Sequence, residues 1–341
     1  MPEKPILSVI VTVTDGAPNL GRCLDALRVQ QNTPAMEIPS MEIIVPVHPG
    51  CDEIEALRKA HPGVRFVLID NLPFTRKPQE RGLRHIVYDY RRSAGLRAAQ
   101  GEIIAMTEDH AIPPPDWCAR IVAIHRELPH AAIGGAIDHA GSTLLSWAAY
   151  FGEFIRYQNP LAEGPSDYAS DVNISYKRAA LEKVRPVWNQ YYHETSVHGA
   201  LRAAGETLWL TPRLFLRHDR GALSFPALCA ERVAWARIFA GRRAQEGPLL
   251  RRLLFALGTP LIPGLFLIRR WKRVWETGRS RLPLLKTAPL LLVLFSFWAF
   301  GEFLGYVTAR PAATGPASRR QPSAVNSSGG SAAVTGAGQT L

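Results

Sequence analysis

Three consecutive residues, Glu108-Asp109-His110, offer the carboxylate and imidazole groups that bind divalent cations. They stand one residue after 102–106, a short apolar run that is typical of a buried strand. A cation held where a strand ends could bridge the two phosphates of a nucleotide-sugar and neutralise the diphosphate as it leaves. A polar turn before a helix has the same composition, so the triplet alone leaves both interpretations open.

The elements that must position this triplet alternate along the chain. Apolar, β-branched runs predict strands and amphipathic stretches predict helices. Such alternation predicts an α/β fold, with a mostly parallel sheet covered by helices on both faces. Ligands bind at the carboxyl ends of the strands in such sheets, so the candidate binding segments are 14–17, 48–52 and 107–112. The expected order is strand 6–13, helix 19–31, strand 42–47, helix 53–60, strand 64–69, helix 93–99 and strand 102–106.

The C-terminal half is more helical. A helix is expected over 193–204, ended by Gly205, then a short strand over 208–210 and a helix over 224–243 that could lie along a bilayer surface. Residues 253–268 are apolar but contain Gly and Pro and fall short of the ~20 residues of a straight span. A kinked or re-entrant segment is therefore expected there.

Basic charge lies between this segment and a second apolar one, 288–307, which is long enough to cross a membrane. Within 269–286 there are seven Lys or Arg residues, with Trp271 and Trp275 among them, in a chain of formal net charge +11. This pattern suits the cytoplasmic headgroup region of a membrane better than a nucleic-acid partner, and no nucleic acid is expected.

Cysteine usage and the N-terminus favour the cytoplasm. The four cysteines are scattered without metal-site or disulfide spacing, and no secretory-signal pattern opens the chain. The N-terminal domain is therefore expected in the cytoplasm, attached to the inner (cytoplasmic) membrane.

Several separated segments together resemble the family 2 glycosyltransferases, whose fold is called GT-A. The resemblance covers about residues 6–243. It implies an inverting, metal-dependent transfer of a sugar from a nucleotide-sugar donor, and the apolar segments suggest a membrane lipid or lipid-linked acceptor. The segments that carry it are Ser8-Val-Ile-Val-Thr-Val-Thr-Asp15, Asn19-Leu-Gly-Arg-Cys-Leu24, Ser93-Ala-Gly-Leu-Arg-Ala-Ala-Gln-Gly-Glu102 and Asp171-Val-Asn-Ile-Ser-Tyr-Lys-Arg178.

The organisation that follows has four parts. They are a catalytic domain over 1–222, an amphipathic interface helix over 223–250, a membrane-associated region over 251–310 and a disordered tail over 311–341. Within the third part, 251–268 is expected to be re-entrant or spanning and 288–307 to be transmembrane.

The resemblance places the family's Asp-x-Asp metal signature on Glu108-Asp109-His110, so that imidazole replaces the final carboxylate. The expected metal ligands are Glu108, His110 and His218. His218 resembles a family histidine that can approach the diphosphate or the metal, although a lone histidine is as often structural. The family implies manganese or magnesium, whereas imidazole suits manganese or zinc-like ions better than magnesium.

The resemblance also implies the base and the binding residues. The family's base belongs to an acidic pair heading a helix, which falls on His193-Glu194, so Glu194 is the expected base and His193 its neighbour or substitute. An acid that merely complements the helix dipole is the alternative. Solvated helix arginines are a common alternative for Arg92 and Arg97, Trp117 is more typical of a core aromatic than of a sugar-stacking platform, and a turn explains Asn173 nearly as well. The expected donor-binding residues are Thr14, Asp15, Asp52, Arg92, Arg97, Glu108 and Asp109, and the acceptor-side residues are Asn173 and Trp117.

One departure from the family concerns the donor, and two other functions stay open. Val47-His48 stands where the family usually has acidic residues that touch the nucleotide, so donor recognition is expected to be rearranged. A nucleotidyltransferase would use a similar sheet and metal, but would release pyrophosphate. A non-catalytic nucleotide-sugar-binding membrane protein would bind the donor without turnover.

Overall fold

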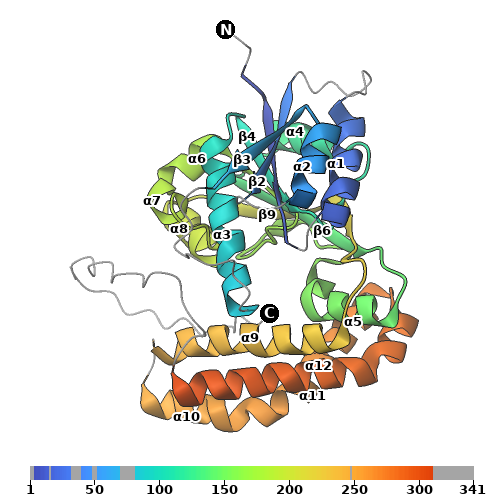
Figure 1. The fold of residues 1–341 in the computed structure, drawn as a ribbon. Helices are drawn as coiled ribbons and strands as arrows, with labels where there is room; N and C mark the ends of the chain where they lie inside the picture. Colours follow the sequence, from blue (N-terminus) through green and yellow to red (C-terminus); the bar gives the residue numbers. More distant parts are fainter. Residues whose placement is uncertain are drawn as a thin grey trace, which may run out of the picture.

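The computed structural model describes residues 4–14, 17–31, 40–47, 52–69, 81–245 and 248–309. Figure 1 shows these residues in two stacked parts: an α/β domain, and beneath it a layer of long helices from the C-terminal part of the chain. The predicted tail over 311–341 lies outside the described residues.

The α/β domain is built on one mixed sheet with the strand order β3-β2-β1-β4-β8-β6-β9-β5, and β7 also pairs with β9. The parallel pairs are β1–β2, β1–β4, β2–β3 and β6–β9, while β8, β5 and β7 pair antiparallel. The predicted fold class is confirmed, because the longer strands form the parallel pairs. The strands are β1 (Leu7–Thr12), β2 (Met41–Val47), β3 (Val64–Leu68), β4 (Ile103–Glu108), β5 (Ala111–Ile112), β6 (Ala132–His139), β7 (Gly164–Pro165), β8 (Ile174–Lys177) and β9 (Leu208–His218).

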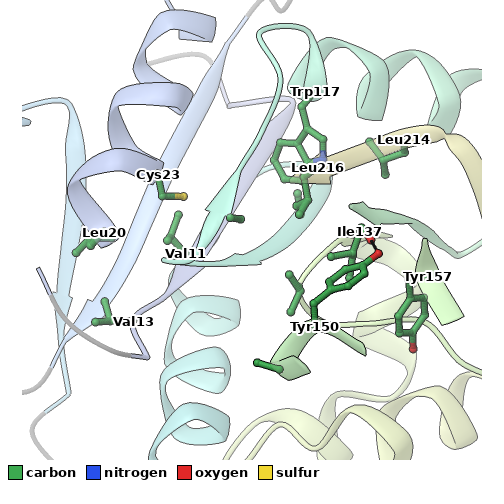
Figure 2. Packing of buried hydrophobic residues seen from close by; sticks show 14 of the residues in the cluster. Val11, Val13, Leu20, Cys23, Trp117, Ile137, Tyr150, Tyr157, Leu214 and Leu216 are labelled. Atoms are coloured by element: carbon green, nitrogen blue, oxygen red, sulfur yellow. Dashed lines mark hydrogen bonds between the residues drawn. The ribbon is translucent and has the colours of Figure 1, made fainter. Parts of the chain in front are cut away.

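Helices cover both faces of this sheet, as the continuous apolar strand β1 requires. All six residues of β1 are buried. Leu7, Val9 and Val11 point into one core cluster and Ile10 into the other, as the two-residue period of a strand dictates. Figure 2 shows part of the first cluster, with Trp117 at the start of α4 among its buried residues.

The helices of the α/β domain follow the expected order. They are α1 (Ala17–Gln31), α2 (Asp52–Ala60), α3 (Arg81–Ala98), α4 (Trp117–Glu127), α5 (Leu144–Glu153), η1 (Ile155–Tyr157), α6 (Arg178–Lys183), α7 (Arg185–Trp188) and α8 (Glu194–Ala203).

One strand is much longer than the sequence pattern predicted. Strand β9 has eleven residues, where a strand over 208–210 was expected. It pairs with β6 on both sides of a register shift between Gly135 and Ala136, so that all of β6 is paired while residues 212–214 of β9 have no partner in β6. The extension carries His218, its last residue, to the edge of the sheet.

The lower layer consists of α9 (Phe225–Gln245), α10 (Leu249–Gly258), α11 (Ile262–Thr277) and α12 (Arg281–Thr308). The short 3₁₀ turn η2 (Thr259–Leu261), which contains Pro260, separates α10 from α11. A kinked or re-entrant course of the first apolar segment stays a prediction. By length and composition, Leu249–Thr277 and Arg281–Thr308 could each cross a membrane, with mean hydropathy 1.4 and 1.8. This is weak support for membrane association, and crossing by 251–268 or 288–307 stays a prediction.

Small residues bring α9 and α12 into close contact. Gly301 and Gly305 of α12 face Ala236, Ala240 and Gly241 of α9. A Cβ atom on Gly305 would lie 2.7 Å from the carbonyl oxygen of Arg237, a separation that side chains do not tolerate. The two helices therefore form one unit.

Replacing Gly301 with alanine should separate these helices. The added methyl group would meet the carbonyl oxygen of Val233 and the Cβ atom of Ala236. We expect Gly301→Ala to lower the free energy of unfolding by about 1–3 kcal/mol, although alanine favours helices. The control Gly264→Ala places its methyl group in open space on α11 and should be neutral or stabilising. Thermal unfolding in detergent measures both, and equal melting temperatures would contradict the close packing.

Candidate active site

The ends of β4 and β9 meet at one edge of the sheet. Glu108 is the last residue of β4, and His110 follows in the turn before β5. Because β5 pairs antiparallel with β9, Ala111 lies opposite His218, which sets His110 beside it. Glu108, His110 and His218 each offer one ligand atom, and these atoms all lie within 4.8 Å of one another. We call these three residues the ligand cluster; the structure brings together the three predicted metal ligands.

The state of His218 suits metal binding. Its ring is buried, and Nε2 has no hydrogen-bond partner among the described residues, while it lies 4.0 Å from Oε2 of Glu108. Burial, together with the nearby His110, Arg220 and His139, holds the pKa of His218 well below its usual value. The ring is therefore neutral and keeps a nitrogen lone pair, which is the form that binds a cation.

Asp109, the middle residue of the triplet, is bonded to Thr14 and is not one of the three ligand residues, although its Oδ1 lies 3.9 Å from Nδ1 of His110. Its carboxylate accepts hydrogen bonds from the backbone N–H of Thr14 at 2.9 Å and from the Thr14 hydroxyl at 2.5 Å. Thr14 Oγ1 also lies 3.2 Å from Nδ1 of His110. Both residues were predicted to bind the donor. Donor binding by them stays a prediction; in the structure they join the end of β1 to the turn that carries His110.

Arg92 of α3 sits in a buried group of three carboxylates. Its Nη1 lies 3.1 Å from Asp89, and its Nη2 lies 2.8 Å from Glu108 and 2.9 Å from Asp171. Burial alone would lower the pKa of Arg92, but the three carboxylates raise it above its usual value. Carboxylates thus contact both terminal nitrogens of Arg92, and its predicted pairing with donor phosphates stays a prediction.

Arg97, one turn further along α3, is also engaged within the protein. Its Nη1 donates to Ser93 Oγ at 2.7 Å and to the backbone carbonyl of Asn189. It fastens α3 to the start of the segment before α8, and its predicted pairing with a donor phosphate stays a prediction.

Two carboxylates around Arg92 were missed at the level of sequence. Asp171 opens the segment 171–178 that carries the family resemblance, which was the only signal for it. Asp89 lies one turn before Arg92 on α3 and resembles an ordinary helix-surface acid. Burial raises the pKa of Asp89 to about 7 and that of Glu108 to about 7, against the opposing effect of Arg92.

Glu194, the predicted base, is the first residue of α8 and lies next to this group. Its Oε2 accepts the backbone N–H of Asp171 at 3.0 Å. Burial and the Asp171 carboxylate raise the pKa of Glu194 well above its usual value, although Arg92 and Arg156 act in the opposite direction. A continuous chain of contacts thus runs from Glu194 through Asp171 and Arg92 to Glu108.

His193 is held by the layer of helices below. Its Nε2 lies 2.9 Å from Nη1 of Arg242 on α9, and since arginine only donates, Nε2 must accept. The proton then sits on Nδ1, 3.0 Å from the Thr195 hydroxyl. Burial and Arg242 lower the pKa of His193 to about 4. This geometry favours Glu194 over His193 as a proton acceptor.

The predicted acceptor-side residues Trp117 and Asn173 are core residues. Both side chains are fully buried, and Trp117 Nε1 donates to Asn173 Oδ1 at 3.0 Å. The Asn173 amide also donates to the backbone carbonyl of Ala136 at 2.8 Å. Neither side chain can reach an acceptor, so that prediction is wrong for both; a buried indole N–H needs a partner, and Asn173 supplies it.

Two predicted donor ligands stay untested. Asp15 lies outside the described residues, as does His48. Asp52 begins α2, but its side chain is not described. The predicted nucleotide contacts therefore remain predictions.

Comparison with known proteins gives one match to a family. The family described as "Glycosyl transferase family 2" matches residues 80–185, a range that contains Asp89, Arg92, Glu108, His110 and Asp171. No curated protein matches the chain. Among solved structures, the chain is similar to a mannosyltransferase from Pyrobaculum calidifontis in complex with GDP-mannose and Mn²⁺, with 16% identity, a TM-score of 0.49, and coverage of 90% of this chain and 86% of that chain. The family match confirms the resemblance read from the sequence motifs: residues 80–185 carry the signature of the family 2 glycosyltransferases.

Proposed function

We propose that this protein is an inverting glycosyltransferase that moves a sugar from a nucleotide-sugar donor to a membrane lipid or lipid-linked acceptor. The observation that carries the proposal is the chain of contacts that joins the ligand cluster to Glu194. This arrangement supports a leaving diphosphate at the ligand cluster and a proton acceptor at Glu194. The family match to residues 80–185 supports glycosyl transfer as the general reaction.

Glu108, His110 and His218 are the residues that would hold a divalent cation. The unpartnered, buried Nε2 of His218 fits such a ligand, and a donor set of one carboxylate and two imidazoles favours Mn²⁺ over Mg²⁺. The cation would supply Lewis-acid stabilisation of the diphosphate. Arg92 keeps one oxygen of Glu108 at 2.8 Å and so orients this carboxylate.

Glu194 is proposed to take the proton of the acceptor hydroxyl. As the acceptor oxygen bonds to the anomeric carbon, the bond from that carbon to the diphosphate oxygen breaks and the hydroxyl proton passes to the Glu194 carboxylate. The raised pKa of Glu194 makes it a better proton acceptor than an ordinary glutamate. The backbone N–H of Asp171 fixes one oxygen, so the other is left to face the acceptor.

A membrane location is supported by the helical layer below the α/β domain. The layer contacts the site through Arg242 and His193, and its outer helices expose large apolar side chains. We propose attachment to the inner (cytoplasmic) membrane with the catalytic domain in the cytoplasm, and no nucleic-acid partner.

A screen of common nucleotide-sugars tests the reaction. Purified protein with Mn²⁺ and a lipid acceptor extract should release a nucleoside diphosphate from one class of donor. Release of pyrophosphate would indicate a nucleotidyltransferase instead. Donor binding by calorimetry without any release would indicate a non-catalytic binding protein.

Replacing His218 with alanine tests the ligand cluster directly. Since groups that merely orient a metal ligand change affinity by 10–100-fold, loss of a ligand is expected to weaken Mn²⁺ binding by about 100-fold. Titration of Mn²⁺ followed by electron paramagnetic resonance measures this without any substrate. The control His130→Ala removes a half-buried histidine that stacks on Trp209, away from the ligand cluster. Equal Mn²⁺ affinity in the two variants would remove His218 from the site.

A further inference from the structure

We propose that α10, α11 and α12 lie within one leaflet of an anionic membrane and do not cross the bilayer. The proposal deepens the membrane-proximal function above, on which it rests. It departs from the transmembrane segment that the apolar run 288–307 predicts. Two sets of contacts, the exposed apolar surface and the charge of this layer carry it.

Both ends of α12 are fastened to the part of the molecule that remains in water. At its start, the Ser280 hydroxyl accepts from Nε2 of Gln158 at 3.0 Å, and Arg279 donates to the backbone carbonyl of Asn159 at 2.9 Å. At its end, Nε2 of Gln245 on α9 donates to the backbone carbonyl of Ala309 at 3.4 Å. A 28-residue helix is about 42 Å long, enough to cross a bilayer, but here its two ends lie on the same side.

The neighbouring helix α9 cannot follow α12 into a bilayer. The two helices run side by side in the same direction, because Gly301 packs on Val233 and Gly305 on Gly241. Arg232 of α9 is buried in ion pairs with Glu153 and Glu231. Figure 1 shows α9 extended beneath the α/β domain, where it also contacts α3. A bilayer perpendicular to α12 would have to contain these charges and the base of the α/β domain, at a cost of several kcal/mol per charge.

The apolar surface of the layer faces away from the domain. Leu250, Leu257, Leu261 and Ile268 are 70%, 77%, 74% and 66% exposed, which is unusual for a surface in water. Helix α12 also exposes large apolar side chains; they are Leu282, Leu285, Leu292, Val293, Phe297, Phe300, Phe303 and Val307.

Charge identifies anionic lipid as the occupant of this surface. Residues 248–309 contain nine Lys or Arg residues and two Glu residues. Trp271 and Trp275 stack on each other near the end of α11 and are 38% and 54% exposed, beside Lys272 and Arg269. Aromatic rings beside basic groups are typical of the headgroup boundary, where in-plane helices bury their apolar face by about 5–10 Å.

Labelling at two positions distinguishes the topologies. Three of the four cysteines are buried, so Cys51→Ala serves as the background for labelling. One exposed thiol is then added in each of two variants, Glu276→Cys before the α11–α12 turn and Thr308→Cys at the end of α12. In vesicles that carry the α/β domain outside, a membrane-impermeant maleimide should label both positions. Protection of Thr308→Cys alone would mean that α12 crosses, and protection of Glu276→Cys alone would mean a hairpin of two spans. Either result overturns the proposal, and neither depends on glycosyl transfer.

Flotation with vesicles tests the lipid itself. We expect binding to vesicles with 30% phosphatidylserine and at least about tenfold weaker binding to pure phosphatidylcholine, because basic residues are attracted to an anionic surface. The double change Leu257→Glu and Leu261→Glu should abolish flotation at an unchanged melting temperature. The control Val29→Glu adds a charge at an exposed site on α1, across the domain from the layer (Figure 1), and should float normally. Equal flotation of both variants, or equal binding to both vesicle types, would contradict the proposal.

Discussion

Replacing Glu194 with glutamine is expected to lower turnover by about 10²–10⁴-fold, the usual contribution of a positioned proton acceptor. Glutamine keeps the shape of the side chain and can still accept the N–H of Asp171, so the fold and donor binding should be unchanged. Nucleoside-diphosphate release measures turnover, and calorimetry with donor and Mn²⁺ measures binding. A binding protein would tolerate this change, whereas an enzyme that uses Glu194 would lose kcat and keep its affinity.

The control and the pH profile separate a proton acceptor from a structural carboxylate. Glu127 at the end of α4 forms an exposed ion pair with Arg213 of β9. The control Glu127→Gln removes this charge and should leave turnover unchanged. Because the pKa of Glu194 is raised, its side chain loses its proton only at higher pH than an ordinary glutamate. Activity should therefore increase as the pH rises through this pKa. Asp171→Asn removes a charge that raises this pKa, so the acid limb should move to lower pH. A limb that stays in place would contradict the role of Glu194.

The fold was largely predictable from sequence because it depends on local patterns. The strand β1 is a run of six buried residues, and the acids and histidine after β4 stand directly behind an apolar run. Each of these signals is contained within about ten residues. The family resemblance then placed Glu194 at the head of α8, where the structure has it.

The contacts that could not be predicted join distant segments. Nothing near Arg92 in the sequence indicates that Asp171 folds against it, and nothing in the triplet distinguishes Asp109, which turns to Thr14, from its neighbours. The side-chain direction alternates along the chain after a strand, so adjacent residues can face a site and a core. Similarly, length and hydropathy indicate that α12 is long enough to cross a membrane. They do not indicate that both of its ends are hydrogen-bonded to other parts of the protein that lie on one side of the proposed membrane.

Replacing Arg92 with methionine is expected to lower the free energy of unfolding by about 3–5 kcal/mol, because removal of one partner leaves buried charges without compensation. Asp89, Glu108 and Asp171 would then face one another in a buried space. Their folded-state pKa values, already about 7 for Asp89 and Glu108, should rise further without the guanidinium. A carboxylate whose pKa is raised on folding stabilises the fold in its protonated form, and this stabilisation is lost as the pH rises through the folded-state pKa. In denaturant titrations with a chelator present, the variant should therefore be nearly as stable as the unchanged protein at pH 5 and most destabilised above pH 7.

The control is Arg97→Met, on the same helix. Among the contacts described, Arg97 hydrogen-bonds only to Ser93 and Asn189, so its replacement should lower the free energy of unfolding far less and with little dependence on pH. If the two variants lose the same stability at both pH values, Arg92 does not hold the three carboxylates together, and the contact chain between Glu194 and the ligand cluster has no electrostatic basis.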